Sequence, residues 1–268
     1  MSESQHDHPL YQQRSQQPQP ATPRKAPPQP RGEGPLLTYL LVGLLVAIYL
    51  AGELLPELGA QLLVGGALIP AAVIDGGQVY RLFTAMFLHA SPGHIFFNAY
   101  ALYMFGSGME TLFGRARLLL IYLLGGLSGS LLSLALGGQG GSWSVGASGA
   151  VFALFTAQAL HLHQHRALYV DVRGKLRHML FIIGINLVIG FMPGSRIDNW
   201  GHIGGMLGGL LLAWRVAPRF PPIALPMRSL RDLARTDTNP LGLQAPFVAL
   251  YCGGLIALSA LVILVRAG

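Results

Sequence analysis

The sequence contains few charged residues and only one cysteine. Asp, Glu, Lys and Arg make up 11% of the 268 residues, where an average soluble domain has about 25%. This shortage excludes an ordinary soluble domain. The single cysteine, Cys252, excludes an internal disulfide. The sequence also lacks the H-E-x-x-H pattern of zinc peptidases, which disfavours a metalloprotease.

Apolar residues and glycine are abundant instead. Hydrophobic residues make up 52% of the chain, which also contains 35 glycines. A helix needs about 20 apolar residues to cross a bilayer, and glycine permits close helix packing there. We therefore predict an all-α polytopic membrane protein, a helical bundle with a six-span core and one further C-terminal helix. The seven predicted spans cover residues 36–52, 94–110, 118–136, 148–165, 179–191, 200–214 and 246–265.

Composition divides the chain into four predicted parts. Residues 1–34 are rich in proline and glutamine and should form a disordered tail. The core then covers residues 35–218, a basic linker 219–243 and the seventh helix 244–268. Within the core, residues 53–93 mix charged and apolar side chains, as in a segment that lies in the membrane interface. The glycine-rich run 137–141 should be a flexible connection.

The basic residues predict the orientation. All of the 18 lysines and arginines except Arg81, Arg196 and Arg266 fall in the tail or in alternate connections. Cytoplasmic segments carry such an excess, so the N-terminus should be cytoplasmic. This sorting also explains the pI near 9.9 without a nucleic-acid partner. No signal or organelle-targeting pattern is apparent, so we expect a bacterial inner membrane.

A serine and a histidine stand at the starts of two spans that enter from the same side. Ser148 opens the fourth span, and His202 lies at the start of the sixth. A serine hydroxyl needs a neighbouring base to become a nucleophile, and histidine suits that role because its pKa is near neutrality. Neither residue alone would indicate catalysis, because serines in helices often bond their own backbone. Together they predict a nucleophile and its base.

Other groups near Ser148 could stabilise an oxyanion. The first N–H groups of a helix have no partner within the helix and lie at its positive end. The small residues Gly146, Ala147 and Gly149 would let a carbonyl group approach them. His94 and Asn98 are spaced i, i+4 on the second span and could supply further donors.

Small residues following His202 predict close packing of the spans that carry the pair. Gly204 with Gly208, and Gly205 with Gly209, form two overlapping small-xxx-small repeats. Such repeats are equally typical of ordinary helix packing. They therefore fit catalytic and structural interpretations alike.

Three motifs together resemble the rhomboid intramembrane serine proteases. They are Gly146-Ala147-Ser148-Gly149, the helix from His202 to Gly209, and His94-Ile95-Phe96-Phe97-Asn98, in the family's order over roughly residues 36–215. The resemblance implies a Ser148–His202 dyad without an acid and without a cofactor. It also implies an oxyanion site that Gly146 and Ser148 help to shape and that His94 and Asn98 complete. Phe152 would stack on the catalytic histidine.

The same resemblance implies an activity and a set of partners. The enzyme would cut transmembrane segments of other membrane proteins near the outer face of the lipid bilayer, through an acyl-enzyme. Gly106, Glu110 and Gly114 resemble a structural motif of the family, and a helix added after the six-span core is also found there.

Further polar residues receive structural interpretations. Asp198, four residues before His202, should be a capping or loop residue, and His89 should stabilise the outer loop by hydrogen bonding. His161 and His165 share a helix face at the cytoplasmic end and could bind a metal, but a metal site is not the prediction. Three alternatives stay open: a non-catalytic protein of the same fold that binds transmembrane clients, a transporter or channel, and a hydrolase of lipids.

Overall fold

Helices make up most of the chain that the structure, a computed structural model, describes. The described residues are 34–137, 143–221 and 230–268. Residues 1–33 of the predicted tail, 138–141 of the glycine-rich connection and 222–229 of the basic linker lie outside them. The chain divides into two units, Met1–Gly34 and Pro35–Gly268.

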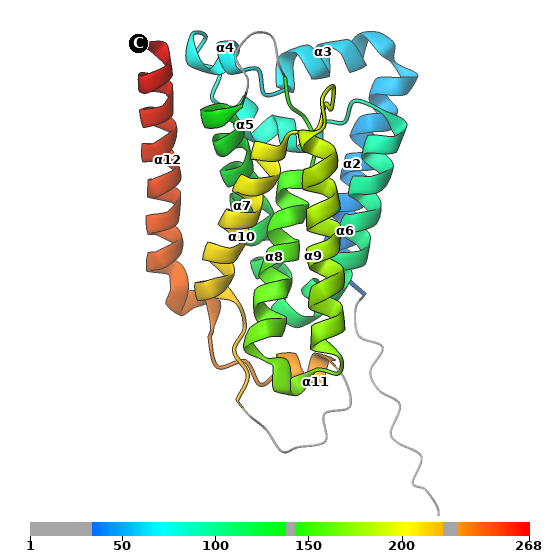
Figure 1. Cartoon of the computed structure of the whole chain (residues 1–268), viewed down its shortest axis with the longest axis vertical. Helices are drawn as coiled ribbons and strands as arrows, with labels where there is room; N and C mark the ends of the chain where they lie inside the picture. Colours follow the sequence, from blue (N-terminus) through cyan, green and yellow to red (C-terminus); the bar gives the residue numbers. More distant parts are fainter. Residues whose placement is uncertain (1–33, 138–142, 222–229) are drawn as a thin grey trace, which may run out of the picture. The chain divides into compact units, whose positions relative to one another are not determined.

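Long helices occupy each predicted apolar stretch (Figure 1). They are α2 (Leu36–Leu54), α6 (Pro92–Phe113), α7 (Arg115–Leu136), α8 (Ser148–Gln164), α9 (Val172–Phe191), α10 (Asn199–Val216) and α12 (Ala245–Ala267). α9 begins two turns before the predicted start of its span, because the Asp171 carboxylate accepts a hydrogen bond from the Gly174 N–H and caps the helix there. These first two turns contain Arg173, Lys175 and Arg177, so hydropathy alone does not predict them as part of the span.

Short helices fill the predicted interfacial segment and the connections at the other end. They are α3 (Pro56–Gly66), α4 (Pro70–Ile74), α5 (Arg81–Thr84), η1 (Ala85–Phe87), η2 (Arg166–Leu168), α11 (Leu230–Ala234) and η3 (Leu241–Gln244). Figure 1 shows α3 and α4 at the end of the bundle opposite α11. The segment between α2 and α6 is therefore largely helical rather than a plain loop.

Within the residues that the structure describes, four helical stretches are long and apolar enough to cross a membrane by themselves: α2, α7, α9 and Leu241–Ala267. α8 has only 17 residues, and α6 and α10 contain many glycine and polar residues. The chain is an all-α, polytopic helical membrane protein. The total of seven spans stays a prediction, because the helices that carry the candidate site are the less apolar ones.

Helices α7, α8 and α10 form the centre of the bundle, and their glycines face neighbouring backbone. A methyl group at Gly205 would lie 2.1 Å from the Gly149 carbonyl oxygen, and one at Gly209 would lie 2.2 Å from that of Ala153. The repeat of Gly204 and Gly208 faces α7, where a methyl group at Gly204 would approach the Ser128 carbonyl oxygen to 2.6 Å. Contacts this close require glycine, and they bring the starts of α8 and α10 together.

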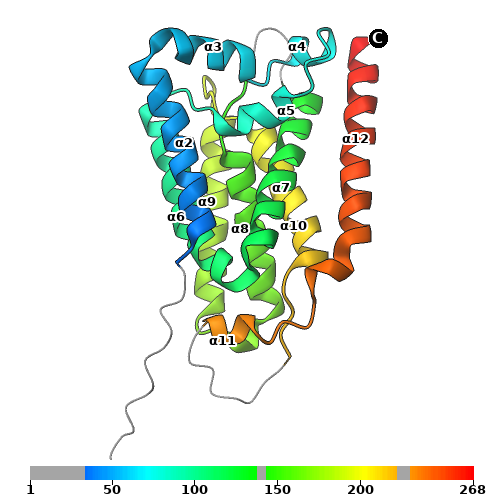
Figure 2. The same cartoon turned by 180° about the vertical axis from the view of Figure 1, so that it is seen from behind.

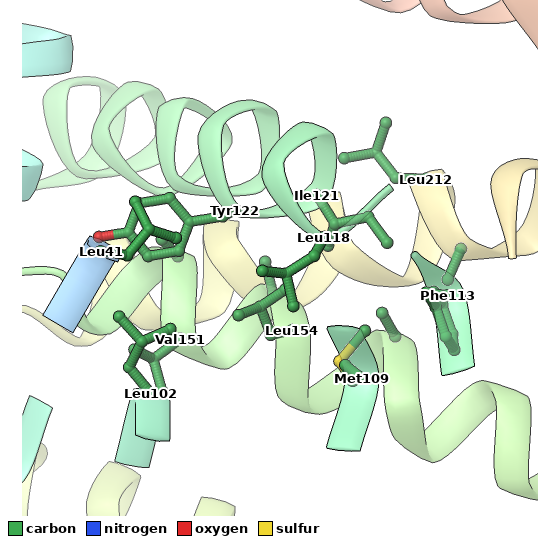
Figure 3. Packing of buried hydrophobic residues seen from close by; sticks show 14 of the residues in the cluster. Leu41, Leu102, Met109, Phe113, Leu118, Ile121, Tyr122, Val151, Leu154 and Leu212 are labelled. Carbon is green, nitrogen blue, oxygen red and sulfur yellow. The ribbon is translucent and has the colours of Figure 1, made fainter. Parts of the chain in front are cut away.

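A buried apolar cluster surrounds this centre. Leu102 and Met109 from α6, Leu118, Ile121 and Tyr122 from α7, Leu154 from α8 and Leu212 from α10 are all almost fully buried. Figure 3 shows these side chains in contact between the helices. The core is therefore shared by the central helices and α6.

Glu110 ties α2 to α6 at the end of the bundle opposite His94. Its carboxylate accepts hydrogen bonds from the backbone N–H groups of Leu37 and Thr38 and from the Thr38 hydroxyl, at 2.7 to 3.0 Å. It thereby satisfies donors at the N-terminus of α2, where a negative charge is favoured. Gly106, one turn earlier, packs on Thr38, and Gly114 has a positive φ of 81° at the α6–α7 turn.

The last helix lies at the edge of the bundle beside α7 (Figures 1 and 2). The Tyr251 and Ser128 hydroxyls are 2.6 Å apart and join α12 to α7. Asp237, between α11 and η3, is held by Arg117, whose guanidinium donates to its carboxylate at 2.7 Å. None of the side chains of α12 is buried, which fits a helix that faces lipid over most of its surface.

Candidate active site

The candidate nucleophile follows a turn that only glycine can make. Gly146 has a φ of 129°, and a methyl group there would lie 2.6 Å from Nε2 of His94. L-residues rarely adopt such a φ. Two residues later Ser148 begins α8, with Ala147, fully buried, as its N-cap residue. The turn therefore places the Ser148 side chain at the start of a helix.

Residues from the interfacial segment support this turn. Leu68 and Ser144 exchange two backbone hydrogen bonds of 2.9 and 3.0 Å, and the Gly146 N–H donates to the Ala85 carbonyl at 2.9 Å. The Gly146 N–H is thus already paired and does not point at an oxyanion. Gly146 contributes its shape instead, and the unpaired donors are those of the first turn of α8.

His202 lies against Ser148. Its Nε2 is 2.8 Å from the Ser148 hydroxyl oxygen, so with the proton on Nδ1 the hydroxyl donates to Nε2. His202 is 5% exposed, and its ring centre is 4.5 Å from that of Phe152, with 42° between the planes. The structure thus brings together Ser148, His202 and Phe152 from two helices.

Asp198 caps the helix that carries His202. Its Oδ1 accepts a hydrogen bond from the Gly201 N–H at 2.8 Å. Its Oδ2 accepts two more, from the hydroxyl of Ser133 at 2.5 Å and that of Ser144 at 2.7 Å. Nδ1 of His202 has no hydrogen-bond partner among the described residues. Asp198 is therefore the expected capping residue, and it also joins α7 to the loop before Ser148.

The two expected donors on α6 behave differently. The ring of His94 lies directly over Gly146, as the close approach to a methyl group there shows. The amide nitrogen of Asn98 donates to the His94 carbonyl oxygen at 3.0 Å, within its own helix. In this structure, therefore, His94 borders the Ser148 turn, while the Asn98 amide is turned toward the α6 backbone.

Two further expectations concern histidines. His89 is buried, but neither ring nitrogen has a hydrogen-bond partner among the described residues, so the expected hydrogen bond is not found. His161 Nε2 lies 2.9 Å from the Tyr169 hydroxyl, and His165 Nε2 accepts from the Phe220 N–H at 3.2 Å. Within the described ranges no group of three or more His, Cys, Asp or Glu residues could hold a metal ion.

The arrangement around Ser148 contains the groups that nucleophilic catalysis by a serine needs. The half-buried Ser148 hydroxyl is bonded to an imidazole, the kind of base that activates a serine nucleophile, and the first turn of α8 supplies donors for a developing negative charge. A cavity of about 30 Å³ lies beside the serine, lined in part by Met86, Gly126, Ser130 and Asp198. It has room for a water molecule or a very small side chain.

Comparison with known proteins agrees with the motifs. Residues 76–219 match the Rhomboid domain. The chain belongs to the rhomboid family. The matched residues include α6, α7, α8, α9 and α10, and the match confirms the family resemblance seen in the sequence. The protein is accordingly an integral membrane protein of this family.

Named relatives include proteins from a plant and a bacterium. The chain is 44% identical over 149 residues to "RHOMBOID-like protein 6, mitochondrial" of Arabidopsis thaliana, covering 56% of this chain and 47% of that protein. It is 34% identical over 180 residues to "Rhomboid protease GluP" of Bacillus subtilis (strain 168), covering 67% of this chain and 34% of that protein.

A third rhomboid relative carries a different description. "Inactive RHOMBOID-like protein 8" of Arabidopsis thaliana is 34% identical over 142 residues, covering 53% of this chain and 39% of that protein. The chain thus spans less than half the length of these relatives. Rhomboid membership includes protease and inactive proteins, so activity depends on the residues of the site.

Four contributors to the site could not be found from the sequence: Leu68, Ala85, Ser133 and Ser144. Leu68 and Ala85 act through backbone atoms, which carry no residue signature. Ser133 and Ser144 are serines among many, distinguished only by their common partner Asp198. The one usable signal was Asp198 itself, an acid just before an apolar helix.

Proposed function

We propose that this rhomboid-family protein is an intramembrane serine endopeptidase with Ser148 as nucleophile and His202 as base. The observation that carries the proposal is the 2.8 Å contact between the half-buried Ser148 hydroxyl and Nε2 of the buried His202, where α8 packs on α10. A serine paired only with its own helix backbone would have no such partner. Both residues come from the motifs that mark the family.

The proposed reaction has two halves. The Ser148 oxygen attacks the carbonyl carbon of a substrate peptide bond while its proton passes to Nε2 of His202. His202 then gives that proton to the departing amine, and the C–N bond breaks to leave an ester on Ser148. Water, deprotonated by His202, attacks the ester, and the proton returns to the Ser148 oxygen as the acid leaves. The first-turn N–H groups of α8, with His94, stabilise the oxyanion in each half.

The proposed substrates are transmembrane segments of other proteins. Ser148 is the first residue of α8. This end of α8 lies toward the short helices between α2 and α6 (Figure 1), at the predicted outer face of the bilayer. A segment cut there must open its helical hydrogen bonds, because a regular helix shields its peptide bonds. The cavity of about 30 Å³ beside Ser148 favours a small side chain at the cut.

The location and the domain limits are proposed from the sequence alone. The proposed catalytic core covers residues 35–218, followed by the linker 219–243 and the helix 244–268, with the tail 1–34 in the cytoplasm. The bacterial inner membrane is proposed on the targeting argument alone. Named relatives come from both Arabidopsis thaliana and Bacillus subtilis. They therefore favour a membrane location but do not indicate which membrane it is.

A fluorophosphonate probe tests the nucleophile. The purified parent protein should be labelled, and Ser148→Ala and His202→Ala should not. Ser259→Ala is a matched control, because Ser259 bonds only its own helix, at the Leu255 carbonyl. His178→Ala, at an exposed position of α9, controls for loss of a histidine. Equal labelling of the parent and Ser148→Ala, or no labelling of a folded parent, would support the non-catalytic client-binding alternative instead.

A further inference from the structure

A second and larger cavity lies between α2 and α3, away from Ser148. It measures about 400 Å³ and is lined by residues of both helices together with Leu88 and His89. The two helices meet at Gly52 and Gly59, where a methyl group on Gly59 would lie 2.5 Å from the Gly52 carbonyl oxygen. This glycine contact sets the angle between α2 and α3, and the cavity lies within that angle.

Polar groups without a well-formed hydrogen bond face this largely apolar cavity. The hydroxyl of Tyr49 and both ring nitrogens of His89 are buried and make no hydrogen bond of normal length and angle among the described residues, although Glu53 lies beside the Tyr49 hydroxyl and the Phe87 backbone lies beside the His89 ring. His89 is only 6% exposed. Leaving a buried polar group unpaired costs about 1–3 kcal/mol, so native structures rarely do so without a reason. Both residues line the cavity, which indicates that a polar group belongs in it.

Glu53 determines the charge of that group. It lines the cavity one helical turn after Tyr49, so both side chains project from one face of α2. A carboxylate in the last turn of a helix is opposed by the helix dipole, so a neighbouring cation would be favourable. Burial lowers the pKa of His89, which lies between η1 and α6, to about 3. Its ring is therefore neutral and can accept a hydrogen bond.

The surroundings of the cavity determine the rest of the ligand. Glu53, Pro56 and Ala60 are exposed, so the cavity opens to the surface of the protein. Leu54 and Leu55 beside this opening are 77% and 58% exposed, as expected for side chains in contact with acyl chains. A ligand that suits both regions has a cationic, hydrogen-bonding head and an apolar tail.

We propose that the cavity between α2 and α3 binds the headgroup of an aminophospholipid, with its primary ammonium group on Glu53, Tyr49 and His89. The ammonium donates to the carboxylate and to the other two side chains. Choline lipids have no N–H donor and lack these bonds, and anionic lipids are repelled by Glu53. The ring of His89 is 4.9 Å from that of His94, so the proposed lipid site shares a wall with the Ser148 turn.

Native mass spectrometry of the full-length protein in detergent tests this proposal. The probes are short-chain phosphatidylethanolamine, phosphatidylcholine and phosphatidylglycerol. We expect phosphatidylethanolamine to bind at least about tenfold more tightly than phosphatidylglycerol, as the loss of a charge-assisted hydrogen bond predicts. Glu53→Gln should abolish this preference, and Ala60→Phe, which fills the opening, should weaken binding of the ethanolamine lipid. Glu57→Gln, on the exposed face of α3 outside the cavity, is the matched control and should bind like the parent.

Binding is read from mass, so the outcome does not depend on protease activity and can be repeated in Ser148→Ala. Equal binding of phosphatidylethanolamine and phosphatidylglycerol by the parent would overturn the proposal. A preference that survives Glu53→Gln, or phosphatidylethanolamine binding that Ala60→Phe leaves unchanged, would also overturn it, because the lipid would then bind elsewhere. Both substitutions lie at exposed positions, and unchanged thermal unfolding verifies that the variants are folded.

Discussion

The carboxylate of Asp198 accepts a hydrogen bond of 2.7 Å from the hydroxyl of Ser144, four residues before Ser148. The same oxygen accepts another from Ser133 at the end of α7, while the second oxygen caps α10. The Asp198 side chain therefore joins three elements: the loop that precedes Ser148, helix α10 that carries His202, and helix α7. Its role is to position these elements, because it makes no hydrogen bond to His202.

We predict that Asp198→Ala lowers stability and also slows fluorophosphonate labelling of Ser148. Loss of the cap should cost about 1–2 kcal/mol, and release of the Ser144 loop should reduce the labelling rate by about tenfold or more. Asp171→Ala is the matched control: it removes a similar cap from α9, far from the site. It should lower the melting temperature and leave labelling unchanged. If Asp198→Ala labels at the parent rate, the positioning role is wrong.

Gly205→Ala should disrupt the contact between α8 and α10. The new methyl group would lie 2.1 Å from the Gly149 carbonyl oxygen, and backbone cannot move aside cheaply. Overpacking of this kind costs about 1–3 kcal/mol, and the separation of Ser148 from His202 should abolish most labelling. Gly184→Ala on α9, where a methyl group meets nothing within 4 Å, should behave like the parent. The melting temperature and labelling rate of both variants measure this, and a Gly205→Ala variant with parental labelling would contradict the packing described.

Glu110→Ala should separate stability from catalysis. The variant loses the hydrogen bonds from Leu37 and Thr38 that tie α2 to α6, and bonds to a charged group are worth about 1.5–3 kcal/mol each. We expect a clear fall in melting temperature. Because Glu110 lies at the opposite end of α6 from His94, labelling measured well below that temperature should stay within about twofold of the parent. Glu57→Ala, at an exposed position on α3, controls for loss of a carboxylate, and slow labelling of a folded Glu110→Ala protein would count against a purely structural role.

His89 should make the protein less stable in acid. Burial lowers its pKa from the usual 6.5 to about 3 in the folded protein. Between these values the unfolded chain binds a proton that the folded chain does not, so stability falls as the pH drops below about 6.5. By pH 5 the loss attributable to His89 is about 2 kcal/mol. His89→Leu should therefore lose less melting temperature than the parent between pH 7.5 and 5, while His163→Leu, at an exposed site, should lose as much as the parent. Equal losses in the parent and His89→Leu would contradict a neutral, buried His89.

The long helices could be predicted from the sequence because hydropathy reports burial in lipid directly. The predicted and observed helix bounds differ most at α9, whose first two turns contain Arg173, Lys175 and Arg177. Sequence placed Ser148 and His202 at the same end of two helices, and the glycines of α10 indicated close packing. The structure brings the two side chains together as that reasoning anticipated.

The supporting contacts could not be predicted in the same way. The pairing of Leu68 with Ser144 joins segments far apart in the chain through backbone atoms alone. The three hydrogen bonds of Asp198 depend on the end of α7 lying beside it. No local sequence pattern near Asp198 indicates this. The cavity at Tyr49, Glu53 and His89 likewise depends on the angle between α2 and α3. Such features are tertiary, and they become visible only when the helices are assembled.

The most direct test of the proposed activity is cleavage of a transmembrane substrate in proteoliposomes, with the products identified by mass spectrometry. A small panel of single-span proteins with small, helix-destabilising residues near the outer face should be reconstituted with the parent, Ser148→Ala and Ser259→Ala. The proposal predicts one cut within the outer part of the span, made by the parent and by Ser259→Ala, and reduced by about 10⁴-fold or more in Ser148→Ala. Identical products from the parent and Ser148→Ala, or no product from a folded parent with any substrate of the panel, would contradict it.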